Sequence, residues 1–273
     1  MNIKFFCPRW GSAGISWDDF LMKAKNAGYD GIEYGIPNNT PVSELERVFE
    51  KVEKLNMLAI AQHHETNDTD ISKHADNFAG WFKKIEPFNW IKVNSQTGKD
   101  FFGFEQNKLL IDIASDYTNT TGISVYHETH RGKFSFAAHV TNEYLQKIPD
   151  LRLTLDISHW VNVAESYLEN QKDAVDMALA RTGHLHARVG YPEGPQVPDP
   201  RSPEWAEAVD THLRWWDKVV YRINKQPLDN LITISPEFGP HPYMVYLPGT
   251  SQPIADQWDI NVFMMQLIRK RYT

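Results

Sequence analysis

The 273-residue sequence has few of the features that mark secreted, membrane-spanning or nucleic-acid-binding proteins. Its single cysteine, Cys7, excludes an internal disulfide and fits a reducing compartment. No apolar run is long enough to span a bilayer, and the apolar part of the N-terminus is too short for a signal peptide. The formal net charge of −7 offers no basic field to attract a polyanion. We therefore expect a cytoplasmic protein with no membrane or nucleic-acid partner.

Short apolar segments with strand character alternate with segments of helical periodicity along the whole chain. The expected strands are 3–7, 31–34, 57–64, 90–94, 123–128, 151–158, 184–189 and 231–237. The expected helices are 17–27, 42–54, 72–84, 104–117, 136–146, 171–181, 203–224 and 255–271. The sequence has no linker or low-complexity segment, so residues 1–273 are expected to form a single domain.

This alternation predicts an α/β fold. A doubly wound sheet would alternate in the same way, but two features favour a (β/α)8 TIM barrel with eight parallel strands. The count of repeats is eight, and polar residues end several strands instead of meeting at one switch point. The chain length also suits a barrel, which typically takes about 250 residues. Enzymes of this architecture have their active sites at the C-terminal ends of the strands.

Four of the expected strands end in residues that can bind metal ions, namely Glu128, Asp156, His186 and Glu237. Side chains alternate between the two faces of a strand, so residues two apart share a face. Each of these strands has one largely aliphatic face, suited to packing under helices. The other face is polar and ends in one of the four residues. Charged groups are costly to bury separately, so the pattern favours one shared site inside the barrel.

Three carboxylates and one imidazole suit Mn²⁺, Co²⁺, Zn²⁺ or Mg²⁺, and the absence of thiolates argues against a structural zinc. A divalent ion here would polarise a carbonyl and its neighbouring hydroxyl. Glu128 and Glu237 could flank a bound sugar, one removing a proton next to the carbonyl and the other returning one. The pattern therefore indicates a metal-dependent enzyme that transfers a proton next to the carbonyl of a sugar.

Residues near these four are candidates for contacts with the substrate. His159 could bond a substrate hydroxyl or cap a helix. Arg188 has the same parity as His186, so it could hold a carboxylate, hydroxyl or phosphate, or pair with a nearby acid. Arg131, on the loop after the fifth strand, could reach an anionic substrate.

The shorter strands supply further candidates by the same alternation. If Leu58 and Ile60 face the helices, His63 points into the barrel. Asn94 and Glu33 would point inward from the fourth and second strands. Trp10, just beyond the first strand, could stack on a sugar ring.

Taken together, these residues resemble the xylose-isomerase-like TIM barrels, a superfamily of sugar and sugar-phosphate isomerases and epimerases. The resemblance spans nearly the whole chain and rests on Glu128, Asp156-x-x-His159, His184-x-His186 and Glu237. It implies that Glu128, Asp156, His186 and Glu237 bind the metal, that the two glutamates move the proton, and that His159 contacts the substrate. The implied substrate is a sugar, a sugar phosphate or an inosose.

Other activities of this superfamily remain open. Its dehydratases use related ligands. Its endonuclease IV branch requires an additional Asp-x-His, where this chain has Asp199-Pro200-Arg201, so one zinc ligand would be missing. A non-catalytic sugar-binding barrel would not need both glutamates. The sequence leaves the substrate, the metal and a homo-oligomeric state open.

Overall fold

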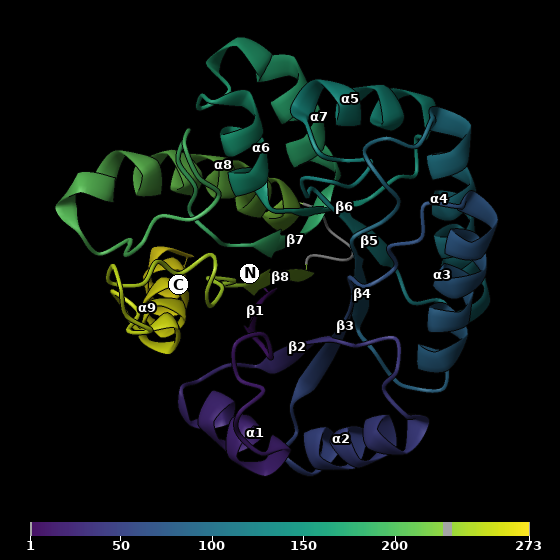
Figure 1. The fold of residues 1–273 in the computed structure, drawn as a ribbon, viewed down its shortest axis with the longest axis horizontal. Coiled ribbons are helices and arrows are strands. Elements are labelled where there is room, and N and C mark those ends of the chain that lie inside the picture. The colour runs from purple at the N-terminus through teal and green to yellow at the C-terminus, as the bar shows by residue number, and fades with distance from the viewer. Residues whose placement is uncertain (1, 226–230, 273) are drawn as a thin grey trace.

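Eight parallel strands form a closed barrel in the computed structural model, which describes residues 2–225 and 231–272 (Figure 1). Each strand pairs with the next along the chain, and the first pairs with the last, which confirms the predicted TIM barrel. The strands are β1 (Asn2–Pro8), β2 (Gly31–Gly35), β3 (Leu58–His63), β4 (Lys92–Ser95), β5 (Val125–Glu128), β6 (Leu153–Leu155), β7 (Thr182–His186) and β8 (Leu231–Ser235).

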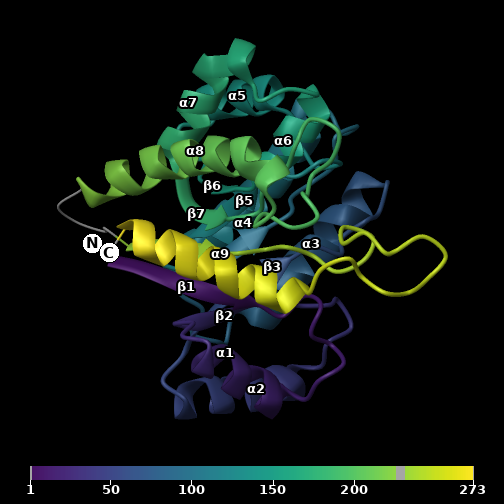
Figure 2. The same ribbon diagram turned by 90° about the vertical axis from the view of Figure 1, so that its left-hand side faces the viewer.

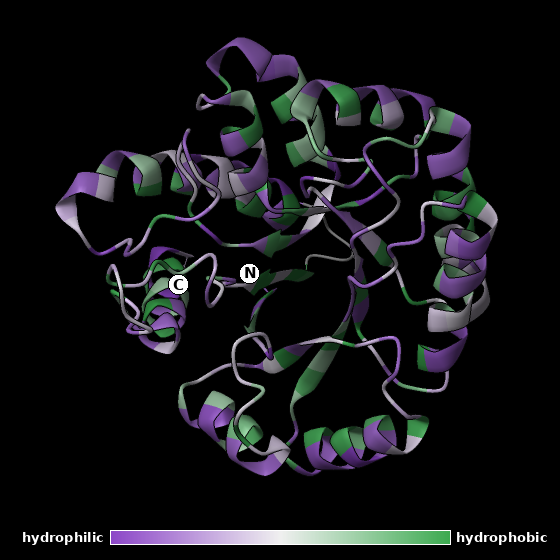
Figure 3. Ribbon diagram, in the orientation of Figure 1, coloured by the Kyte–Doolittle hydropathy of each residue, from purple (hydrophilic) through white to green (hydrophobic). Residues whose placement is uncertain are grey.

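Helices surround the barrel (Figures 1 and 2). They are α1 (Trp17–Asn26), α2 (Val42–Lys54), α3 (Ile71–Ile85), α4 (Phe104–Thr121), α5 (Ala138–Lys147), α6 (Ile157–Ala164), α7 (Lys172–Arg181), α8 (Ala206–Asn224) and α9 (Gln257–Tyr272), with short 3₁₀ turns η1 (Glu169–Gln171) and η2 (Pro203–Trp205). Polar and apolar residues alternate along them, as expected for amphipathic helices on a barrel (Figure 3). None of the helices in the described ranges has both the length and the apolar character that a membrane crossing requires.

The two faces of the later strands follow the predicted alternation. The helix-facing residues belong to the buried apolar core: Val125, Leu153, Leu155, Leu185, Ala187, Ile232 and Ile234. Burying an aliphatic side chain of this size contributes roughly 1.5–3 kcal/mol, so this core stabilises the barrel strongly. The opposite faces of the same strands are thereby turned into the barrel, where their polar side chains bond to one another.

The third strand has the reverse orientation to the one predicted. Ala59 and Ala61 pack in the core under the helices, whereas Gln62 points inward and donates to Glu237. The pairing of β2 with β3 places Ile60 beside Glu33, and paired residues of parallel strands share a face. The aliphatic residues of this strand occupy both parities, so the sequence pattern does not distinguish its two faces.

The predicted strand 151–158 is also too long. β6 ends at Leu155, and a short helix that the hydrophobic pattern does not predict, α6, begins at Ile157. Asp156 is the residue before this helix, and its side chain accepts a hydrogen bond from the backbone N–H of Ser158. The helix places His159 one turn beyond Asp156, on the same side of the barrel mouth.

Candidate active site

The four residues predicted as metal ligands meet at the C-terminal end of the barrel. Glu128 ends β5, Asp156 follows β6, His186 ends β7 and Glu237 follows β8. Each offers a ligand atom within 4.8 Å of the others, and all four side chains are buried. The group therefore has the composition and the spacing to hold one divalent cation.

The two ring nitrogens of His186 have different surroundings. Nε2 lies 2.9 Å from Glu33 Oε1 and bonds to it. Nδ1 lies 2.8 Å from Glu237 Oε2 and 3.7 Å from Glu128 Oε1, but within the described part of the chain it has no aligned hydrogen-bond partner. With a proton held on Nε2 by Glu33, Nδ1 faces the carboxylates and can give its lone pair to a cation that displaces its proton. This buried, unsatisfied nitrogen fits the predicted cation.

Glu33 lies one layer deeper in the barrel and collects several donors. His184 Nε2 bonds to its Oε2 at 3.1 Å, and the hydroxyl of Ser235 bonds to the same oxygen. Asn94 Nδ2 lies 3.2 Å from its Oε1, beside the bond from His186. Because several lumen-facing neighbours contribute to this network, the imidazole of His186 has little freedom to turn.

The charges of these buried groups shift one another's pKa. Burial alone would lower the pKa of His186, but Glu237, Glu33 and Glu128 outweigh it and raise that pKa well above its ordinary value. Burial would raise the pKa of Glu128, but the charge of His186 outweighs it and lowers that pKa. Burial raises the pKa of Glu237, only partly opposed by His186. The site thus holds a strong negative potential that a cation would neutralise.

Asp156 is held from two sides. Its Oδ1 accepts from the backbone N–H and the hydroxyl of Ser158, and its Oδ2 accepts from Arg188 Nη2. The Arg188 guanidinium also lies 3.0 Å from His159 Nε2 and 3.5 Å from Glu237 Oε2. Arg188 Nε and Nη1 and His159 Nδ1 are buried without a hydrogen-bond partner among the described residues. Arg188 lines the cavity at the mouth of the barrel, so its unused nitrogens are placed to bond to a ligand, whereas His159 does not line that cavity.

Aromatic rings stand beside these polar groups. Trp10 and Tyr243 meet edge to face at a centroid distance of 5.2 Å, and the Arg188 guanidinium lies 4.6 Å from the Tyr243 ring. Gly239 allows this arrangement, because a Cβ there would overlap the Trp10 ring at 2.1 Å. Trp10 and Tyr243 thus form one wall of the site, suited to the apolar face of a sugar ring.

The remaining predicted substrate residues have different positions. Asn94 points inward and donates to Glu128 Oε2 at 2.9 Å. Arg131 Nη1 donates to Asn162 at 3.3 Å, and its guanidinium lies 5.1 Å from the Tyr243 ring. The inward orientation predicted for His63 is wrong: its ring packs against Phe78 and Trp81 of α3, since β3 has the opposite parity.

Three residues of the site were not singled out from the sequence. Gln62 Nε2 donates to Glu237 Oε1 at 3.0 Å, and Gln96 Nε2 lies 3.3 Å from Glu128 Oε1. Tyr243 lies on the long segment after β8. The alternation rule finds Gln62 only once the parity of β3 is known, and no local pattern distinguishes Tyr243 from other loop aromatics.

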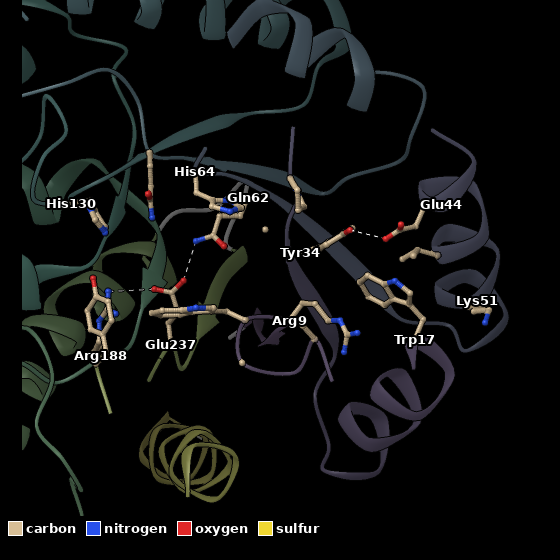
Figure 4. Close-up of a pocket in the computed structure, with 18 of the residues that line it drawn as sticks. Arg9, Trp17, Tyr34, Glu44, Lys51, Gln62, His64, His130, Arg188 and Glu237 are labelled. Carbon is tan, nitrogen blue, oxygen red and sulfur yellow. Dashed lines mark hydrogen bonds and ion pairs between the residues drawn. The ribbon is translucent and has the colours of Figure 1, made fainter. Parts of the chain in front are cut away.

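A cavity of about 780 Å³ opens above these groups (Figure 4). Its lining near the barrel axis includes Glu237, Gln62, Gln96, His130 and Arg188. Of the four predicted ligands, Glu237 lines the cavity and the other three lie behind it. A small molecule can therefore approach the carboxylate cluster from the mouth of the barrel.

Comparison by sequence finds no relative: no protein-family model matches the chain, and no curated protein matches it. Comparison of structures finds many. The chain is similar over 99% of its length, with a TM-score of 0.61 and 16% identity, to the whole of the probable 3-DHS dehydratase AsbF involved in petrobactin synthesis in Bacillus anthracis. It is equally similar, with a TM-score of 0.61 and 13% identity over 99% of each chain, to a D-psicose 3-epimerase studied in the presence of D-fructose.

An endonuclease IV from Thermus thermophilus also matches, with a TM-score of 0.58 and 13% identity over 99% of this chain and 98% of that one. At such identities the similarity shows the fold. The resemblance to xylose-isomerase-like TIM barrels that the sequence predicts is therefore confirmed at the level of the fold. Activity within that fold depends on the site residues, because one barrel supports many reactions.

Proposed function

We propose that this protein is a metal-dependent isomerase or epimerase that transfers a proton beside the carbonyl of a sugar-like substrate. The unsatisfied Nδ1 of His186, directed at two buried carboxylates, supports this proposal most directly. A metal-binding histidine has one ring nitrogen held by a hydrogen bond and the other directed at the ion and its carboxylate ligands, which is the arrangement of His186.

Glu128, Asp156, His186 and Glu237 would hold the ion. A divalent cation in this position would act as a Lewis acid that draws electrons from the carbonyl and acidifies the neighbouring C–H. The ion could be Mn²⁺, Co²⁺, Zn²⁺ or Mg²⁺, since oxygen ligands with one imidazole suit all four.

Glu128 and Glu237 are the groups that would move the proton. Amide donors orient both: Asn94 and Gln96 bond to Glu128, and Gln62 bonds to Glu237. A carboxylate held in this way loses little orientational freedom at the moment of proton transfer. Because the two come from strands on different sides of the barrel, one would remove the proton and the other would return it.

The unused donors beside them would bind the substrate. Arg188 lines the cavity, and its unused Nε and Nη1 would bond to hydroxyl or carbonyl oxygens of a sugar, with His159 behind it at 3.0 Å from Nη2. Trp10 and Tyr243 would lie against the C–H face of the sugar ring. The net charge of the protein and the mixed lining of the cavity suit a small polar substrate.

The nuclease alternative has less support. It would require a further metal ligand near Asp199, but that carboxylate is held by Arg201 through two short contacts of 2.8 and 2.7 Å. A dehydratase would begin with the same proton removal, so nuclear magnetic resonance of the substrate would also detect it through loss of water.

The test is proton exchange in heavy water. The Mn²⁺-loaded protein is mixed with ketoses, inososes and their phosphates, and deuterium beside the carbonyl is measured by nuclear magnetic resonance. We expect exchange in at least one substrate and its loss, by a factor of about 10² or more, in Glu128→Gln and Glu237→Gln. Glu207→Gln, on the outer helix α8, is the matched control. Wild-type protein that binds no divalent ion and exchanges no proton would overturn the proposal.

A further inference from the structure

The cavity is much longer than the carboxylate cluster requires. From Glu237 and Arg188 it continues past Gln62 to Trp17 and Lys51, so it leaves the barrel axis and runs out over β2 toward α2 (Figure 4). We call this outer part, lined by Arg9, Ala13, Trp17, Tyr34, Pro37, Glu44, Arg47, Val48 and Lys51, the outer arm. A volume of about 780 Å³ falls in the range of roughly 300–1,000 Å³ that accommodates drug-sized ligands, larger than one sugar ring.

One face of α2 forms the far wall of the outer arm. Glu44, Arg47, Val48 and Lys51 are spaced i, i+3, i+4 and i+7, so they lie along the same side of the helix. Arg47 has no hydrogen bond or ion pair within the described residues, and only one oxygen of Glu44 is used, by the hydroxyl of Tyr34 at 3.0 Å. This wall therefore offers both a donor and an acceptor that the described residues do not use.

Aromatic rings form the floor of the outer arm, and they are held in place. Trp17 meets Tyr34 edge to face at 4.7 Å and carries the Arg9 guanidinium 4.5 Å from its ring. Arg9 is itself fixed by bonds from its guanidinium to the carbonyl oxygens of Ser12 and Ile15. An indole that is half-buried and fixed from several sides presents a rigid surface to a ligand, with little entropy to lose on binding.

We infer that the outer arm is a second sugar-binding subsite, so that the substrate of this protein is a ketose carrying a further glycosyl group. The inference rests on the proposed function, because the carboxylate cluster must act on the carbonyl-bearing end. A flat aromatic surface beside unused donors and acceptors matches a pyranose ring, whose C–H faces are apolar and whose rim is made of hydroxyls.

The lining distinguishes this occupant from two others. A purely aromatic substituent would cover Arg47 and the second carboxylate oxygen of Glu44 without bonding to them, at a cost in free energy. A phosphate would meet the carboxylate of Glu44 as well as the cations, and Lys51 is already paired with Asp18 at 2.6 Å. A neutral group rich in hydroxyls can donate to the carboxylate and accept from the cationic side chains without such a penalty.

The test compares simple and extended ketoses. Calorimetry of the Mn²⁺-loaded protein gives dissociation constants for fructose and for lactulose, turanose and isomaltulose, in which a second ring is linked to fructose at different positions. We expect at least one disaccharide to bind tenfold or more tightly than fructose. Trp17→Ala should reduce that ratio roughly tenfold, the size of one stacking contact.

Arg47→Ala is a second variant whose side chain is exposed, so it should fold normally and lower the same ratio severalfold. Glu50→Ala, exposed on α2 but outside the cavity, is the matched control and should leave the ratio unchanged. The inference is overturned if no disaccharide binds more tightly than fructose, or if the preference survives both variants. Deuterium exchange on the bound sugars separates the two proposals. If a disaccharide binds more tightly than fructose but no sugar exchanges its proton, only the proton-transfer function is rejected. If a sugar exchanges its proton but no disaccharide binds more tightly than fructose, only the second subsite is rejected.

Discussion

Glu33 Oε1 lies 2.9 Å from His186 Nε2, in the interior of the barrel, and both side chains are buried. The contact joins β2 to β7 across the lumen, so it depends on closure of the whole sheet. A carboxylate behind a histidine ligand fixes which nitrogen carries the proton and makes the other nitrogen a better ligand. Glu33 therefore acts on the predicted metal site through His186 without reaching the ion.

We expect Glu33→Gln to weaken Mn²⁺ binding by about 10- to 100-fold, because an amide is a weaker acceptor and does not support a partial positive charge on the ring. Calorimetric titration of the metal-free protein measures the change. Glu44→Gln, a carboxylate variant outside the cluster, should bind Mn²⁺ as the wild type does. Equal affinities in Glu33→Gln and the wild type would show that the contact is only structural.

Metal binding should depend on pH. The carboxylates around His186 raise its pKa well above the ordinary value, so the ring is protonated near neutral pH when no ion is bound. The ion must then displace a proton from Nδ1, and its affinity should rise about tenfold per pH unit while one proton is released. Calorimetry in buffers of different ionisation enthalpy counts that proton. An affinity that does not change between pH 6 and 8, about the range where metal and proton should compete, would contradict this account.

Acid should destabilise the fold through His212. This histidine of α8 accepts from Gly190 N at 3.2 Å and lies 2.8 Å from the Ala208 carbonyl oxygen, an arrangement that requires the neutral ring. Burial lowers its pKa to about 4, whereas an unfolded histidine titrates near 6.5. Between these pH values the unfolded chain binds the extra proton, so the free energy of unfolding falls as the pH falls, by up to about 1.4 kcal/mol per pH unit.

Urea denaturation at several pH values measures this slope. Below about pH 6.5, the ordinary pKa of histidine, we expect His212→Gln to make unfolding less dependent on pH. The slope should fall by an amount that corresponds to the uptake of at most one proton on unfolding. His139→Gln, exposed on α5, should leave the slope as it is in the wild type. A slope that His212→Gln does not alter would mean that other buried histidines account for the acid sensitivity.

Arg188 should be important for stability as well as for binding. Its guanidinium is buried, bonds to Asp156 and lies near Glu237. Replacing one member of a buried pair leaves an uncompensated charge, so Arg188→Met should lower the free energy of unfolding by about 3–5 kcal/mol in the absence of metal. Mn²⁺ should restore part of the loss, because it neutralises the same carboxylates.

Chemical denaturation measures the free energy of unfolding of Arg188→Met, and Arg201→Met is the control variant. Arg201 pairs with Asp199 at the surface, where an ion pair contributes about 1 kcal/mol or less. If Arg188→Met is no more destabilising than Arg201→Met, the buried cluster tolerates its own charge without Arg188.

The alternation of residues in the later strands predicted which of their side chains point into the barrel. In β6, β7 and β8 one parity is aliphatic and the other polar, so the inward orientation of His186 could be deduced from neighbours in the sequence. The same reasoning failed for β3, where Ala59, Ile60 and Ala61 provide apolar residues on both faces. When both faces of a strand carry apolar residues, either face can be buried under the helices, so the pattern does not show which one points inward.

The sequence by itself determined the number of repeats, the barrel and the strand ends at which Glu128, Asp156, His186 and Glu237 occur, because these depend on local periodicity. Only the tertiary structure decided the partners of those residues: Gln62 on Glu237, Glu33 behind His186, and the outer arm formed by Trp17 and α2. Such contacts join segments far apart in the chain, and their geometry is set by strand pairing around the closed barrel. Hydrophobic periodicity specifies which face of a strand is buried, whereas barrel closure specifies which buried polar groups meet.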